Sequence, residues 1–119
     1  MNQSRSGKKF IFGTECDYKG THTWHVYDPY DHKWVSTSIA CNVPPAYTWN
    51  HIVLEYTRTD AGNTGFVTVT INGNKHYFNR AYAPRSTSTS EINVAFQMDG
   101  NKSMTDYSVW LDKVKLTYW

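Results

Sequence analysis

The chain has 119 residues, enough for one domain with one hydrophobic core. It is 16% aromatic, with nine Tyr and five Trp, and only 18% charged, a composition typical of strands and turns rather than helices. The net charge of +2 comes from scattered residues and the densest basic stretch is Lys8-Lys9, so nucleic acid is not an expected partner.

The sequence contains no apolar run long enough to span a membrane, and residues 1–10 lack the apolar centre of a signal peptide. Two settings stay open from these observations alone. Either the protein is cytoplasmic, or Met1 is not the natural start of the mature chain.

Apolar residues alternate along the chain instead of following a helical period, which predicts about eight strands and no helix. The expected strands are residues 9–16, 22–27, 33–41, 48–59, 65–71, 74–79, 91–100 and 106–119. Residues 28–32 and the dipeptide Asn72-Gly73 have the composition of hairpin turns. Residues 81–90 are polar and without pattern, which indicates a surface connection. A single all-β domain over residues 1–119 follows, an antiparallel sandwich or jelly roll.

The last two expected strands form a hairpin whose two sides can be assigned if their apolar residues coincide. The apolar side carries Val94, Phe96, Met98, Tyr107, Val109 and Leu111. The other side carries Asn93, Gln97, Trp110 and Asp112, an indole among amides and a carboxylate. Beyond Leu111 the apolar positions shift to Val114, Leu116 and Tyr118, which predicts either a bulge near Asp112-Lys113 or a strand that changes which layer it covers.

Paired carboxylates, which glycoside hydrolysis requires, have only weak candidates in this chain. Glu15 and Asp17 lie two residues apart but run into a turn, and no longer acidic array is present. The other acids considered are Asp28, Asp31, Asp99, Asp106 and Asp112. We interpret most of them as turn-forming or solvated residues.

Calcium is the one candidate cofactor, because oxygen-rich loops such as residues 28–31 and 98–101 suit a hard cation. Neither loop has the full spacing of a calcium motif, so the sequence predicts no defined metal site. The histidines, including the pair His22 and His25, are interpreted as surface or strand-face residues. No serine or cysteine lies in a motif of nucleophilic catalysis.

Aromatic residues are the most informative group, because sugar rings stack on exposed aromatics while amides and carboxylates bind their hydroxyls. Trp24, Tyr27, Tyr30 and Trp34 crowd one hairpin, although core packing is the usual role of such residues. The sequence predicts a ligand-binding surface at Trp110, Gln97, Asn93 and Asp112, and a second patch at Trp34 and Tyr30.

Two cysteines, Cys16 and Cys41, fit neither a zinc site nor a redox pair of the CxxC type. Two free thiols are one interpretation. Each cysteine ends a strand-like run beside a turn-rich segment, which favours a disulfide and with it an oxidising compartment.

Several motifs in order, KFIFGTEC, WVSTSIAC, TWNHI, TING, FQMDG and WLDKVKLTYW, resemble a family of secreted soil-bacterial proteins of the concanavalin A-like lectin/glucanase superfamily. The resemblance implies a jelly-roll sandwich and an extracellular setting, and it strengthens the Cys16–Cys41 pairing. It implies no catalytic residues, since the superfamily hosts lectins, glucanases and lyases. Family members continue upstream of KFIFGTEC, so we expect a shortened domain with open sheet edges and a tendency to form homodimers.

The sequence thus predicts a non-catalytic, extracellular module that binds carbohydrate. A glycoside hydrolase or polysaccharide lyase of the same fold is the enzymatic alternative. A structural or adhesion module without a small ligand is the third.

Overall fold

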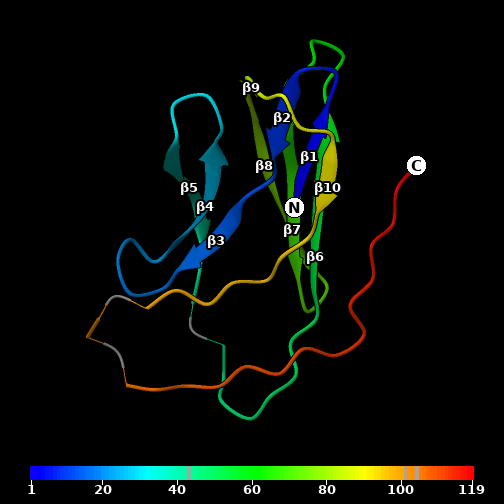
Figure 1. Ribbon diagram of the computed structural model, residues 1–119. Helices are drawn as coiled ribbons and strands as arrows, with labels where there is room; N and C mark the ends of the chain where they lie inside the picture. The colour runs from blue at the N-terminus through cyan, green and yellow to red at the C-terminus, as the bar shows by residue number, and fades with distance from the viewer. Residues whose placement is uncertain (43, 101, 104) are drawn as a thin grey trace.

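The computed structural model describes residues 1–42, 44–100, 102–103 and 105–119. Ten strands lie in this part of the chain (Figure 1). They are β1 (Asn2–Arg5), β2 (Lys8–Ile11), β3 (Thr14–Asp17), β4 (Thr23–Asp28), β5 (Lys33–Ala40), β6 (Ile52–Arg58), β7 (Thr64–Ile71), β8 (Asn74–Tyr82), β9 (Arg85–Ser86) and β10 (Glu91–Asn93). A search of the same residues finds no helix of the length and hydropathy needed to cross a membrane.

The strands form three antiparallel sheets, which confirms the prediction of an all-β chain. Their orders are β10-β1-β2-β9, β3-β4-β5 and β6-β7-β8. Every pairing within them is antiparallel. The arrangement is sandwich-like, because the β3-β4-β5 and β6-β7-β8 sheets share one hydrophobic core.

Both hairpins with clear local signals are present. β4 and β5 pair around the turn that contains Pro29, and β7 and β8 pair around Asn72-Gly73. Asn72 and Gly73 have φ angles of 49° and 87°. Two consecutive residues with positive φ are the requirement of a type I′ turn, whose twist matches that of the strands it joins.

The core lies between the two three-stranded sheets. Alternation along β4 points Trp24 and Val26 inward, where they meet Phe66 and Val69 of β7. The buried set is completed by Ile39, Cys41 and Phe78. Val26, Phe66 and Val69 are at most 1% exposed, and full burial of such side chains contributes about 1.5–3 kcal/mol each.

Phe12 and Tyr56 connect the remaining sheet to this core. Phe12 follows β2 and its ring lies 5.3 Å from that of Tyr56 and 6.4 Å from that of Phe66. The Tyr56 hydroxyl and the Thr14 hydroxyl are hydrogen-bonded at 2.9 Å. Burial raises the pKa of Tyr56 to about 12, so the phenol stays protonated in this contact.

The strands differ from the sequence prediction in three further places. The expected strand 9–16 is divided into β2 and β3, because Phe12-Gly13 carries the chain from one sheet to the next. Residues 2–5 form β1 although their sequence is polar, since β2 and β10 flank β1 on both sides. Residues 85–86, expected in a surface connection, form the short strand β9 against β2.

The expected C-terminal hairpin is not formed. Of its two arms, only Glu91–Asn93 is a strand, and it pairs with β1 rather than with residues 106–119. β1 begins at Asn2, which lies opposite Asn93, so the ladder ends there. The following segment is drawn in Figure 1 as an orange-to-red trace without arrows at the periphery. Lys113 in this segment has a φ of 52°. Because residues 106–119 pair with no strand of the described chain, the bulge predicted at Asp112-Lys113 stays a prediction.

Cys16 and Cys41 form the predicted disulfide, with their Cα atoms 5.6 Å apart. Cys16 lies on β3 and Cys41 directly follows β5, so the bond joins the two edge strands of the β3-β4-β5 sheet across the buried side of β4.

Replacing both cysteines (Cys16→Ala with Cys41→Ala) should lower the free energy of unfolding by about 3 kcal/mol, because the disulfide closes a loop in the unfolded chain. Urea unfolding of the variant and of the reduced wild type should give similar losses. If the oxidised and reduced wild type unfold at the same urea concentration, the bond does not stabilise the fold.

Candidate functional site

One side of the β3-β4-β5 sheet faces away from the core and carries polar and aromatic side chains. Because Trp24 and Val26 point inward, their neighbours Thr23, His25 and Tyr27 point outward. Cross-strand pairing adds partners from both neighbouring strands. In β3, Glu15 lies opposite His25 and Asp17 lies opposite Thr23. In β5, Ser36 lies opposite His25 and Trp34 lies opposite Tyr27. We name this surface the outer face, and its residues are Glu15, Asp17, Thr23, His25, Tyr27, Trp34 and Ser36.

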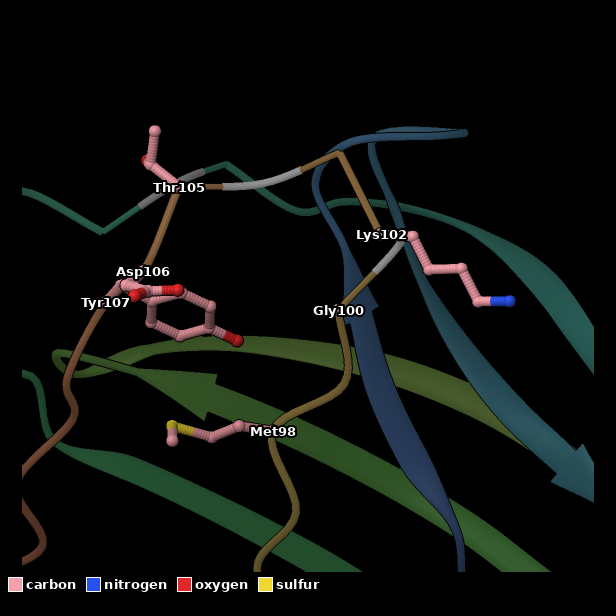
Figure 2. A pocket seen from close by; sticks show the side chains of 6 residues that line it. All are labelled: Met98, Gly100, Lys102, Thr105, Asp106 and Tyr107. Atoms are coloured by element: carbon pink, nitrogen blue, oxygen red, sulfur yellow. The ribbon is translucent and has the colours of Figure 1, made fainter.

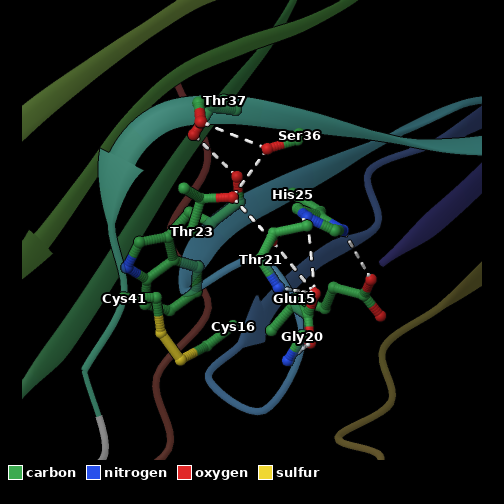
Figure 3. Close-up of polar contacts among 11 residues, drawn as sticks. Glu15, Cys16, Gly20, Thr21, Thr23, His25, Ser36, Thr37 and Cys41 are labelled. Atoms are coloured by element: carbon green, nitrogen blue, oxygen red, sulfur yellow. Dashed lines mark hydrogen bonds and ion pairs between the residues drawn. A yellow bond between two sulfur atoms is a disulfide. The ribbon is translucent and has the colours of Figure 1, made fainter.

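His25 is the centre of the polar half of the outer face. Its Nδ1 lies 3.0 Å from Glu15 Oε1, and its Nε2 lies 2.8 Å from Thr21 Oγ1 and 3.8 Å from Asp17 Oδ2. Figure 3 shows the chain of contacts that continues from Thr21 through Thr23 to Ser36. The His25 side chain is only 12% exposed, so it is held by these neighbours rather than by water.

Glu15 and His25 are joined by a hydrogen bond between Oε1 and Nδ1 at 3.0 Å. The Thr21 hydroxyl donates to Asp17 Oδ2 at 3.0 Å and makes a second hydrogen bond with His25 Nε2 at 2.8 Å. Oε1 of Glu15 is thereby engaged, while within the described residues Oε2 makes no hydrogen bond and can accept one from a ligand.

The two carboxylates of the outer face have opposite environments. Backbone N–H groups of Thr21 and Gly20 donate to Asp17 and hold the pKa of that carboxyl below its ordinary value. Burial raises the pKa of Glu15, against the opposing effect of its hydrogen bond to His25, and the negative charges of Asp17 and Asp99 raise it further. Asp17 therefore fixes the turn between β3 and β4, and Glu15 is the carboxyl available for chemistry or binding.

Trp34 and Tyr27 form the aromatic half of the outer face. Their rings pack edge to face with centroids 5.2 Å apart. The indole lies over Gly13, where an added Cβ would come within 3.1 Å of Trp34 Cη2 and 2.9 Å of Tyr27 Cβ. Trp34 remains 44% exposed, and Tyr30 in the adjoining turn is 68% exposed. Tyr27 and His25 are successive outward residues of β4, so the aromatic and polar halves lie about 7 Å apart.

The carboxylates of the outer face do not have the arrangement of a glycosidase. Such enzymes need open space for the substrate between two carboxyl groups about 5–9.5 Å apart. Here the imidazole of His25 and the hydroxyl of Thr21 lie between Glu15 and Asp17. The arrangement suits recognition of hydroxyl groups instead.

The structure does not bring the first predicted set of ligand-binding residues together on a sheet. Asn93 ends β10 opposite Asn2, whereas Gln97, Trp110 and Asp112 lie in segments without a strand. All four are exposed, Trp110 to 70%. The second predicted patch, Trp34 and Tyr30, lies at the aromatic end of the outer face.

The loops considered for calcium are used in other ways. Asp28 Oδ1 accepts hydrogen bonds from the backbone N–H groups of Tyr30 and Asp31, and Asp31 pairs with Lys33 at 2.7 Å. In the second loop Asn101 lies outside the described residues, while Asp99 and Gly100 lie within them. No cluster of three or more His, Cys, Asp or Glu suited to a metal is found in the part of the chain that the structure describes.

Two hollows lie elsewhere. One of about 350 Å³ is lined by Met98, Gly100, Lys102, Thr105, Asp106 and Tyr107 (Figure 2). The other, of about 750 Å³, lies between the aromatic residues Phe10, Phe12 and Tyr56 and the C-terminal residues Leu116 to Trp119. Neither combines an ordered aromatic pair with a polar network, so the outer face is the stronger candidate.

Sequence reasoning missed Glu15, Thr21, His25 and Ser36 as members of one site. It placed His25 among surface or strand-face residues and considered Glu15 only with Asp17, as a weak candidate carboxylate pair that runs into a turn. The signal was available in the alternation of β4, because inward Trp24 and Val26 require His25 to point outward. Its partners depend on the register across β3 and β5, which includes a bulge between Thr23 and His25.

Asp17→Asn should destabilise the protein at neutral pH, because the backbone donors of the turn lose a charged acceptor. The pKa of Asp17 is lowered by folding, so its contribution is present above the unfolded pKa of about 3.9 and is lost as pH falls through the lower folded value. Urea unfolding of both proteins should show a difference at pH 7 that closes in acid. Asp31→Asn, which alters only an exposed pair, is the control; an equal effect there would contradict the role of Asp17.

Comparison with known protein families, curated proteins and solved structures finds no match. The functional argument therefore rests on the outer face itself. Its exposed indole, free carboxylate oxygen and row of hydroxyl groups are the observations that a proposed function has to explain.

Proposed function

We propose that the protein is a non-catalytic, extracellular carbohydrate-binding module of concanavalin A-like jelly-roll type. The observation that carries the proposal is the outer face, where an exposed indole held by Tyr27 lies beside a polar network. Sugars present an apolar ring face and a rim of hydroxyl groups, and the outer face offers a partner for each.

Trp34 is the residue on which a sugar ring would stack, with Tyr30 at the edge of the same surface. Glu15 Oε2 would accept from a sugar hydroxyl. Ser36 and Thr23, which are hydrogen-bonded to each other at 2.6 Å, supply further donors and acceptors. The aromatic and polar halves of the outer face lie about 7 Å apart along β4. The surface is therefore longer than one sugar ring, which favours a polysaccharide or oligosaccharide over a monosaccharide.

The extracellular setting is supported by the Cys16–Cys41 disulfide, since such bonds form and persist in oxidising compartments. The jelly-roll assignment is supported by the antiparallel pairing and by the core shared by two sheets. The surface around Trp110, Gln97, Asn93 and Asp112 remains the second candidate for the same ligand.

Affinity gel electrophoresis with soluble neutral and charged polysaccharides tests the proposal. Wild type should be retarded by at least one of them. Trp34→Ala should weaken that binding roughly tenfold, the equivalent of about 1.4 kcal/mol and the size expected for loss of one aromatic contact. Trp34→Phe should retain part of the affinity.

Trp49→Ala is the control, because Trp49 is an exposed tryptophan, to 70%, that lies in the connection between β5 and β6. Its affinity should equal that of wild type. Absence of binding to every polysaccharide would refute the carbohydrate function. A loss in Trp110→Ala with none in Trp34→Ala would move the site to the C-terminal segment.

A further inference from the structure

The C-terminal segment has the sequence pattern of a strand but pairs with no strand in the described part of the chain. From Tyr107 on, eight large apolar side chains are exposed. They are Tyr107, Val109, Trp110, Leu111, Val114, Leu116, Tyr118 and Trp119. Within the described chain, residues 105–119 form no strand and no backbone hydrogen bond. An extended apolar segment with free N–H and C=O groups is a template for pairing with another strand.

The sequence of this segment is symmetric about its centre. Residues 107–118 read YSVWLDKVKLTY, so the apolar positions are mirrored on the two sides of Asp112-Lys113. Two copies laid antiparallel with Asp112 opposite Lys113 would match Leu111 with Val114, Val109 with Leu116 and Tyr107 with Tyr118. The same register places Ser108 opposite Thr117 and Trp110 opposite Lys115.

Charge complementarity favours this register. Each copy would contribute Asp112 to one ion pair and Lys113 to another, so two oppositely charged pairs would lie side by side at the centre of the ladder. Lys115 would lie beside the indole of Trp110, a favourable contact for a cation. The bend at Lys113, with its φ of 52°, lies at the same centre.

We propose that residues 107–118 pair antiparallel with the same segment of a second copy of this chain, with Asp112 opposite Lys113. The register leaves no apolar residue opposite an acid. The alternative occupant, the chain's own residues 91–98, fits less well. A hairpin that placed Phe96 opposite Val109 would set Glu91 opposite Val114, and Glu91 is already paired with Ser4 of β1 and with Lys9.

Sedimentation of charge variants tests the pairing. Wild type should be a dimer. Asp112→Lys and Lys113→Asp should each raise the dimer dissociation constant tenfold or more, because each places like charges opposite one another twice. An equimolar mixture of the two variants should dimerise again, since every charged pair is then complementary, and this recovery excludes misfolding as the cause of the loss. The double variant Asp112→Lys with Lys113→Asp should also dimerise.

Asp60→Lys and Lys19→Asp make the same charge changes at exposed positions elsewhere and should leave the dimer intact. The register is tested separately by mixing Ser108→Cys with Thr117→Cys, which should yield a disulfide-linked dimer that Ser108→Cys alone does not form. A monomeric wild type would overturn the proposal. Protection of residues 107–112 from hydrogen exchange in that monomer would indicate that they pair with residues 91–98 of the same chain instead. Single variants that dimerise as wild type does, or a mixture that stays monomeric, would overturn it equally.

Discussion

The packing of Trp24 and Val26 of β4 against Phe66 and Val69 of β7 is the constraint on which the rest of the structure depends. It joins the two three-stranded sheets, and it decides which residues of β4 remain outside. Because successive side chains of a strand point to opposite faces, the inward orientation of the two apolar side chains makes Thr23, His25 and Tyr27 face outward. The outward orientation of these side chains therefore follows from the packing of the core.

Local patterns predicted those parts of the fold that depend on local chemistry. The Asn72-Gly73 turn and the β4–β5 hairpin are both set by residues close in sequence. Strands that depend on distant partners could not be predicted in this way. β1 is polar and becomes a strand through pairing with β2 and with β10, which follows it by more than 80 residues, whereas residues 106–119 have a strong strand pattern without a partner in the described chain.

The candidate site shows the same division. Trp34 and Tyr30 were predicted because exposed aromatics around a hairpin can be recognised in sequence, although not distinguished from core residues. The network of Glu15, Thr21 and His25 could not be predicted, because it depends on the register between β3 and β4. That register also determines the structural roles of Glu15 and Asp17, the two acids of β3. Asp17 holds a turn and Glu15 holds a histidine, so each acid of a pair that resembled catalytic carboxylates in sequence binds a part of the β3–β4 hairpin.

Gly13 has a consequence for how strongly the two candidate surfaces could bind. Because position 13 has no side chain, the indole of Trp34 lies directly over the backbone, and Tyr27 closes it from one side. Its orientation is thus set before any ligand arrives, and a bound sugar would lose little affinity to the ordering of its platform. Within the described residues Trp110 belongs to no strand, so no ladder fixes the backbone beneath its indole. For equal contacts, the platform over Gly13 should bind more tightly.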